Sequence, residues 1–418
     1  MPENKPAIRF KGFENDWEQR KFEDLLDKKD GVRRGPFGSA LKKEIFVSKS
    51  DYVVYEQQNA IYDNYKTRYN IPQSKFEELS KFSLEEGDFI MSGAGTIGRI
   101  SRVPVGIKQG VFNQALIRFK INNEVTDSEY FIQFVRADNM QRKLTGANPG
   151  SAINNLVPMS EVKNWDILVP SKQEQKRLGD FFKILDNTIT LHQQQLENLK
   201  KTKKAYLQKM FPKNNEKVPE IRFEGFADDW EQRKLGEVTN LITKGTTPKD
   251  KSWAGSVNYV KTESIDSISG YINVTANISL EEHNGYLKRS QLKTDDLLFS
   301  IVGTLGRVGV VRDMDLPANT NQQIAVIRLS NIVNNRFIFH SLKTSKISAF
   351  IKSDATIGAQ PSLSLWQINE LNIPYTDITE QVKVGKFLDI LDNTIALHQR
   401  KLDYLKEMKK GLLQKMFV

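Results

Sequence analysis

A glycine-rich turn in the first half of the chain has the most recognisable chemistry in the sequence. Gly93, Gly95 and Gly98 give the spacing Gly-x-Gly-x-x-Gly, which binds dinucleotide phosphates when a strand precedes it and a helix follows. The residues after it resemble a second strand, and Pro104 among them does not fit an ordinary helix. The sequence therefore favours a tight hairpin with glycines at positive φ over a nucleotide-binding loop.

The hairpin occurs twice. Thr96-Ile97-Gly98-Arg99 returns as Thr304-Leu305-Gly306-Arg307, and each copy is followed by an Asn-Gln pair, Asn113-Gln114 or Asn321-Gln322. Arginine suits phosphates and guanine edges, while asparagine and glutamine can bond adenine through two hydrogen bonds. The alternative is structural: the hairpin closes a sheet and the amides cap turns. Because both copies keep the arginine, we predict that Arg99 and Arg307 contact phosphates rather than bases.

Other loops carry basic, aromatic and small polar side chains that suit DNA. The further candidates are Arg33, Arg34, Tyr65, Lys66, Arg68, Ser92 and Ser151 in the first half, and Lys244, Thr246, Thr247, Lys249, Trp253 and Gln360 in the second. For any single one of them, ordinary surface polarity is the better explanation. As a set they differ between two otherwise similar halves, which is where sequence specificity would be encoded.

Catalytic signatures are missing from the sequence. There is no Gly-x-x-x-x-Gly-Lys-Ser/Thr loop and no Asn-Pro-Pro-aromatic stretch. Glu161-Val162-Lys163 has nuclease-like spacing, but its counterpart Gln367-Ile368-Asn369 lacks the carboxylate. With no cysteine and four histidines, a structural metal is not expected. We predict that the chain has no catalytic residue and binds no metal.

The elements that position these loops are also duplicated. Ile8-Arg9-Phe10 and Trp17-Glu18-Gln19-Arg20-Lys21 return as Ile221-Arg222-Phe223 and Trp230-Glu231-Gln232-Arg233-Lys234. The segments Leu185–Ile189 and Leu207–Phe211 return as Leu391–Ile395 and Leu413–Phe417. A molecule built twice, with its framework kept and its interior varied, is suited to reading two different half-sites.

A long helix is predicted at the end of each half. Ser171 with Glu174, and Asp377 with Glu380, fit the capping-box spacing at the helix starts. Apolar residues then recur at intervals of four and three for more than three heptads, which predicts a coiled coil. The two helices are expected to pack antiparallel against each other. His192, His398, Lys203 and Lys409 occupy matching seam positions; fixing the register is one explanation, and a pH switch or metal pair is the other for the histidines.

The composition sets the class. The chain has 418 residues and a formal net charge of +10, which suits a polyanionic partner but also occurs in basic proteins that bind no nucleic acid. No apolar run has the length of a membrane span, and the first residues lack the apolar core of a signal peptide. Together with the lack of cysteine, this predicts a cytoplasmic location.

The predicted fold is α+β: two tandem β-rich domains separated by two long helices that form an antiparallel coiled coil, with pseudo-two-fold character from the internal duplication. The expected boundaries are 1–170 for the first domain, 171–212 for the first spacer helix, 213–376 for the second domain and 377–418 for the second spacer helix.

The ordered combination of opening segments, hairpins, Asn-Gln pairs and Glu-Gln helix starts resembles the specificity subunits of type I restriction-modification systems. The resemblance implies that the two β-rich domains are target recognition domains and that the chain reads a bipartite sequence in double-stranded DNA. It implies assembly with two modification (methyltransferase) subunits that methylate adenine N6 and with ATP-dependent restriction subunits. S-adenosylmethionine, ATP and Mg²⁺ would bind those partners, and no cofactor would bind this chain. The alternatives are a stand-alone two-domain DNA-binding regulator and a degenerate coiled-coil scaffold.

Overall fold

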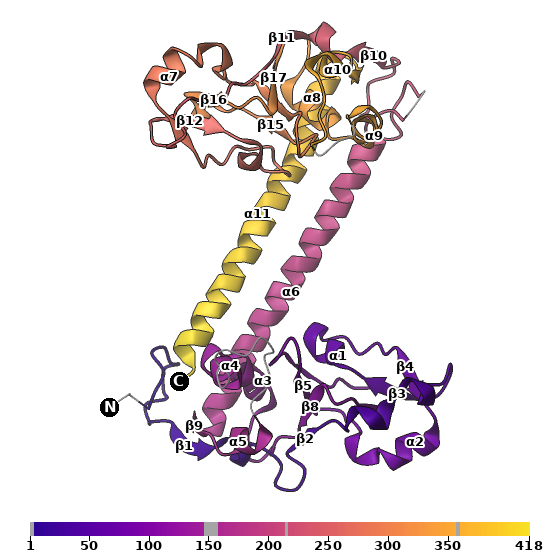
Figure 1. Ribbon diagram of the computed structural model, residues 1–418, viewed down its shortest axis with the longest axis vertical. Helices are drawn as coiled ribbons and strands as arrows, with labels where there is room; N and C mark the ends of the chain where they lie inside the picture. The colour runs from indigo at the N-terminus through magenta and orange to yellow at the C-terminus, as the bar shows by residue number, and fades with distance from the viewer. Residues whose placement is uncertain (1–3, 146–157, 214–215, 357–359) are drawn as a thin grey trace. The chain divides into compact units, whose positions relative to one another are not determined.

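The computed structural model describes residues 4–145, 158–213, 216–356 and 360–418. The chain forms two compact units: Met1–Leu191 with Asp403–Val418, and His192–Leu402. Two long helices, α6 (Lys172–Lys209) and α11 (Ile378–Met416), contribute residues to both units (Figure 1). Each unit therefore combines one β-rich domain with a part of each helix.

The domain of the first unit contains two small sheets and a closing strand pair. Four antiparallel strands follow the order β2-β8-β5-β6, and three follow the order β4-β3-β7, in which β3 and β7 are parallel. A pair of strands, β1 and β9, joins the start and the end of the domain. The strands are β1 (Glu18–Lys21), β2 (Val32–Arg34), β3 (Tyr52–Tyr55), β4 (Tyr69–Ile71), β5 (Phe89–Ser92), β6 (Ile100–Arg102), β7 (Gly110–Phe112), β8 (Leu116–Phe119) and β9 (Asp166–Val169).

The domain of the second unit repeats this topology. Its sheets follow the orders β11-β17-β14-β15 and β13-β12-β16, and β10 pairs with β18. The strands are β10 (Glu231–Lys234), β11 (Thr239–Lys244), β12 (Val257–Val260), β13 (Asn277–Ile278), β14 (Leu297–Ser300), β15 (Val308–Val310), β16 (Ala318–Thr320), β17 (Ile324–Leu329) and β18 (Asn372–Tyr375). Equal strand orders confirm that the sequence repeat is a repeat of structure.

Each domain has two consecutive helices where the residue pattern predicts one helical stretch, around Tyr130 to Leu144 and around Arg336 to Ile351. The stretch from Tyr130 to Leu144 breaks at Ala137, whose backbone is extended, and Thr344 breaks the equivalent stretch in the same way. The pairs are α3 (Ser128–Arg136) with α4 (Asp138–Thr145), and α8 (Asn335–Ser341) with α9 (Ser345–Asp354). The shorter helices are α1 (Gln57–Tyr62), α2 (Gln73–Glu78), α5 (Met159–Lys163), α7 (Leu280–Asn284) and α10 (Leu365–Asn369).

The long helices pack antiparallel within each unit, as predicted. In the second unit the Tyr206 ring of α6 lies 4.9 Å from the Phe387 ring, and His192 lies 5.8 Å from His398. In the first unit Phe182 of α6 contacts Phe417, and further along α6 Asp186 accepts a hydrogen bond from Lys409. The predicted apolar stripe is largely buried in both units. Burial of this stripe drives the pairing of the helices.

The opening segments clamp the starts of the long helices. The guanidinium of Arg9 donates two hydrogen bonds of 2.7 Å to the buried carboxylate of Glu174, and Arg222 binds Glu380 in the same bidentate way. The capping-box prediction is therefore only half right. Ser171 does accept from the Glu174 amide, but both carboxylates bind arginines instead of the cap, because bidentate, charge-assisted bonds are the stronger ones.

The repeated Met-Phe at the end of each long helix seals a domain core. Phe211 packs on Trp230 and Phe337 in the second unit, with rings 6.1 Å and 5.3 Å apart. Phe417 stacks at 5.7 Å on Tyr130 in the first unit. Each copy of the motif thus completes the core of the unit that contains the other copy's domain.

Candidate nucleic-acid interface

A polar surface in the first domain forms where a glycine loop lies on the Asn-Gln turn. After β2, the amide of Gly35 donates to the Leu116 carbonyl, and Arg34 donates to the Gln114 carbonyl at 3.3 Å. A β-carbon at Gly35 would lie 1.9 Å from the Asn113 carbonyl oxygen, so only glycine allows this approach. The structure thus brings together two predicted groups that are far apart in the sequence.

The second domain builds the same surface with different side chains. The amide of Gly245 donates to the Ile324 carbonyl, and a β-carbon there would lie 2.0 Å from the Thr320 carbonyl oxygen. Thr247 donates its hydroxyl hydrogen bond to the side-chain oxygen of Gln322. Arg289 donates to the hydroxyl of Thr246 at 3.3 Å. We call each of these surfaces a platform: residues 34–38 with 113–114, and residues 244–247 with 321–322.

The two side-chain amides of each Asn-Gln pair have different roles in the structure. Asn113 accepts from the amide of Ala115 at 3.1 Å, and Asn321 accepts from the amide of Gln323 at 3.0 Å. Both asparagines therefore cap their turns. Gln114 and Gln322 are exposed, which leaves the glutamines as the side chains of each pair that can reach a base edge.

The glycine hairpins have the predicted geometry. Gly95 and Gly98 have φ of +64° and +79°, and Gly303 and Gly306 both have +76°. The hairpins connect β5 to β6 and β14 to β15, which are antiparallel strands. This geometry excludes the dinucleotide reading, which requires a helix after the glycines.

One hairpin candidate is structural. Ser92 is fully buried, and its hydroxyl donates to the Thr96 carbonyl and accepts from the Arg99 amide. Its expected contact with DNA is incompatible with this burial, because the side chain closes the hairpin from inside. The hydroxyl-bearing residues Thr96 and Thr304 at the hairpin tips are exposed.

The two hairpin arginines, equivalent in sequence, differ in structure. Arg99 is exposed, and its guanidinium has no partner within the described part of the chain. The guanidinium of Arg307 donates to the carbonyls of Thr262 and Ile265 at 3.0 and 3.3 Å. Arg307 therefore holds a loop of its own domain, while Arg99 is available to a ligand.

The other first-half candidates vary in availability. Arg33 pairs with Asp30, and Arg68 pairs with Glu56. The Tyr65 hydroxyl shares a 2.8 Å hydrogen bond with Ser101, and burial raises its pKa. Arg34 and Lys66 are exposed, and Ser151 lies outside the described residues.

The second-half candidates include one stacked aromatic side chain. Trp253 stacks on Tyr259 with ring centroids 5.5 Å apart, and the Lys261 ammonium lies 3.8 Å from the Trp253 ring. The Lys249 ammonium lies 4.8 Å from the ring of Tyr286. Lys244 and Gln360 are exposed.

Sequence reasoning missed three exposed side chains. Phe37 is 87% exposed within the first platform, and Trp366 is 70% exposed on α10. Arg289 is exposed beside Thr246 of the second platform. A single side chain in a loop or in a helix of five residues carries no periodic signal, so only the folded arrangement identifies these residues.

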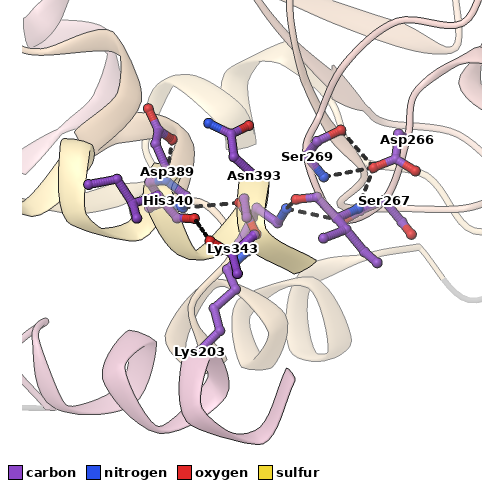
Figure 2. Close-up of polar contacts among 12 residues, drawn as sticks. Lys203, Asp266, Ser267, Ser269, His340, Lys343, Asp389 and Asn393 are labelled. Atoms are coloured by element: carbon purple, nitrogen blue, oxygen red, sulfur yellow. Dashed lines mark hydrogen bonds and ion pairs between the residues drawn. The ribbon is translucent and has the colours of Figure 1, made fainter. Parts of the chain in front are cut away.

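A buried polar cluster joins the second domain to both long helices (Figure 2). Lys203 of α6 donates to the buried carboxylate of Asp392 on α11, and Lys343 donates to the carbonyls of Ser267 and Ile268. His340 of α8 contacts Asp389 at 2.8 Å, and its other ring nitrogen lies 4.0 Å from Asp392. Burial lowers the pKa of His340 to about 4 and that of Lys343 to about 7.

The first unit has an equivalent but simpler cluster. Asp186 corresponds to Asp392, and it accepts from Lys409 at 2.6 Å and from Gln133 at 2.9 Å. Gln133 stands where the second domain has His340. The seam lysines Lys203 and Lys409 therefore bind the aspartates of the repeated Leu-Asp-Asn-Thr-Ile motif, each on the opposite long helix.

His340 is expected to make the second unit sensitive to acid. Its pKa of about 4 lies below the ordinary value of 6.5, so the unfolded chain binds this proton more readily. Above pH 6.5 His340 is neutral in both the folded and the unfolded chain, and the unit keeps its full free energy of unfolding. This free energy falls by on the order of 3 kcal/mol as the pH drops toward 4, because only the unfolded chain takes up the proton. His340→Gln, which copies Gln133, should flatten the dependence of the urea midpoint on pH between 4.5 and 7. Equal pH profiles for the variant and the wild type would contradict this expectation.

The described residues contain neither a metal-binding group nor a membrane-spanning helix. No group of three or more His, Asp or Glu within the described ranges is arranged to hold a metal ion. Among the same residues, no helix combines the length and apolar character that a membrane crossing requires.

The chain therefore has two domains of one topology, and each presents a platform with different polar side chains. The comparison with family models is specific: the type I restriction modification DNA specificity domain matches residues 14–201 and 227–407. The chain belongs to this family and is a type I specificity subunit, which is a recognition component rather than a catalytic one.

Curated relatives cover most of the chain. The chain is similar to the type I restriction enzyme MjaVIII specificity subunit of Methanocaldococcus jannaschii, with 24% identity over 401 residues, 91% of this chain and 90% of that protein. It is also similar to a putative type I specificity subunit of Mycoplasma genitalium, with 25% identity over 289 residues, 66% of this chain and 68% of that protein.

Solved structures share the fold. The S subunit of a type I restriction-modification system from M. genitalium gives a TM-score of 0.65 at 19% identity and covers 99% of both chains. A chain from a structure concerned with complex assembly and conformational transition of the type I system gives 0.56 at 14% identity, covering 97% of this chain and 98% of that one. Both confirm the predicted architecture of two domains and two long helices.

Proposed function

We propose that this specificity subunit reads a bipartite sequence in double-stranded DNA, with one half-site for each domain. The observation that carries the proposal is the pair of platforms. The backbone contacts that build them are repeated, whereas the side chains at their surface differ: Arg34, Phe37 and Gln114 in one, and the half-buried Thr247 with the exposed Arg289 and Gln322 in the other. A common frame with different side chains gives two different readers of the same kind of ligand.

The proposal includes two modification subunits bound to the long helices. Ile184 and Leu191 of α6 are exposed by 66% and 54%, and Ile390 and Leu397 of α11 are both exposed by 62%. These pairs occupy equivalent positions in the repeat and have the same spacing of seven residues, so each pair lies along one helix face. Two equal apolar stripes support two copies of one partner.

The chemistry belongs to partners in this proposal. The modification subunits would bind S-adenosylmethionine and methylate adenine N6, and the restriction subunits would use ATP and Mg²⁺. The chain itself would bind DNA and no cofactor.

Exchange of one domain tests the proposal. Because β10 pairs with β18, residues 235–371 can be replaced by those of a relative while both strands at the domain base are kept. The complex with its partner subunits should then methylate a target in which one half-site is new and the other is unchanged. Since each mismatched base pair costs about 1–3 kcal/mol, the original target should lose its preference.

The measurement is methylation mapping of DNA from cells that produce the chain with its partners. The matched control replaces residues 22–165, between β1 and β9, and should change the other half-site. A change in both half-sites after either exchange, or in neither, would refute one domain per half-site.

A further inference from the structure

A basic cavity in the first unit lies beside the hairpin that carries Arg99. Its volume is about 460 Å³, and its lining comes from the end of α1, from the hairpin, from the α3–α4 junction and from the last turns of α11. The cationic side chains of the lining are Arg99, Arg136, Lys406, Lys409 and Lys410. All of them belong to the first unit.

Two of these cations already share one carboxylate partner. Lys409 donates to Asp186 at 2.6 Å, and Arg136 lies 3.5 Å from the same carboxylate. Burial lowers the pKa of Lys409, while the hydrogen bond to Asp186 opposes this shift. Lys409 and Arg136 therefore line the cavity but are not the groups that would bind a ligand.

Three cations remain available. Arg99, Lys406 and Lys410 are exposed, and none has a side-chain partner among the described residues. Of the carboxylates in the lining, Asp138 accepts from Gln414 at 2.5 Å, and Asp63 is exposed. The recess therefore carries an excess of positive charge, which its low-dielectric walls focus on any anion that enters.

The equivalent residues of the second unit are used differently. Arg307 binds two carbonyls of its own domain, and Lys200, which corresponds to Lys406, donates to Gln399 at 3.4 Å. By contrast, Lys203, which corresponds to Lys409, is used in the same way, because it is bonded to Asp392 as Lys409 is to Asp186. The hairpin arginine is thus available in the first unit and occupied in the second.

We infer that this cavity binds one backbone phosphate of DNA next to the first half-site. The inference rests on the proposed function and assigns the phosphate contact to the first unit. A base edge carries no net charge, whereas a phosphate matches the positive charge that the lysine and arginine side chains bring to the cavity. Three cations from a hairpin and a helix converge on one recess, which suits a single tetrahedral anion. The contact positions the DNA and carries no sequence preference of its own.

The test is the salt dependence of DNA binding by the complex with its partner subunits. Labelled duplexes with and without the mapped target are titrated between 50 and 300 mM KCl and followed by fluorescence anisotropy. Arg99→Ala and Lys410→Ala should each weaken binding to both duplexes about fivefold and flatten the slope of log K against log salt by up to about 0.9. Because the two side chains share one phosphate, the double variant should not flatten the slope by much more than about 0.9.

Control variants and other outcomes separate the alternatives. Lys5→Ala removes an exposed charge paired with Asp16 in the same unit and should keep the wild-type slope. A wild-type slope for Arg99→Ala and Lys410→Ala, with wild-type melting temperatures, overturns the inference and leaves the proposed function intact. Loss of copurification with the modification subunit also overturns it, because the cavity would then dock an acidic protein surface. A wild-type complex with no preference for any duplex refutes the proposed function itself.

Discussion

Replacing Asp392 with alanine is expected to destabilise the second unit by about 3–5 kcal/mol, because it leaves the buried ammonium of Lys203 without a counter-ion. The side chains of Lys203 and Asp392 are 11% and 1% exposed, so water cannot replace the lost partner. His340 also loses a neighbouring carboxylate at 4.0 Å. Hydrogen exchange of the α8 amides in the full-length chain measures the loss directly.

Two further variants make the comparison specific. Glu220→Ala removes an exposed partner of Lys209 and should leave the free energy of unfolding nearly unchanged, because water screens such a pair. The double variant Lys203→Met with Asp392→Leu removes both charges and should regain most of the stability, because apolar side chains of similar volume often replace a buried ion pair without loss. A loss below about 1 kcal/mol for Asp392→Ala would show that the ion pair does not hold the helices together.

Gly245→Ala is expected to abolish recognition of the second half-site. The new β-carbon would lie 2.0 and 2.3 Å from the carbonyl oxygens of Thr320 and Asn321, so the loop must leave its place on the Asn-Gln turn. Thr247 then loses the hydroxyl bond that orients Gln322. Affinity for the target should fall by on the order of 100-fold, while binding to unrelated DNA stays unchanged.

The repeat supplies a matched partner for this variant. Gly35→Ala should have the same effect on the first half-site, because a β-carbon there meets the Asn113 carbonyl at 1.9 Å. Gly411→Ala, on α11 with open space around it, should keep target affinity and raise helix stability by up to about 1 kcal/mol. If the Gly245 variant keeps its sequence preference at both half-sites, the platform does not take part in DNA recognition. The readout is competition anisotropy with duplexes altered in one half-site at a time.

Local patterns predicted most of the framework. The hairpins, the strands around them and the stripes of the long helices follow from residue spacing, because these features depend on neighbours in the sequence. Both domain helices were predicted too long, since nothing in the sequence shows that Ala137 and Thr344 take extended backbone.

The candidate site could be predicted only as a set of residues. Nothing in the sequence pairs Glu174 with Arg9 or places Gly35 on Asn113, because these contacts join residues that are far apart along the chain. The hairpin arginines look equivalent, and their difference depends on whether the carbonyls of Thr262 and Ile265 lie within reach. Ser92 is excluded as a DNA-contacting residue because it is buried, and its neighbours in the sequence do not indicate that burial.

The exchange of Met-Phe ends between the two units has a consequence for synthesis on the ribosome. The first unit needs residues from Asp403 onward, including Phe417 against Tyr130, and these are translated only after the whole second unit. A nascent chain that stops at Phe211 already carries the same motif and an unfilled aromatic core around Tyr130 and Phe182. Two such half-length chains could fill each other's cores, so the fold is compatible with an ancestor that was a symmetric dimer of a single gene product.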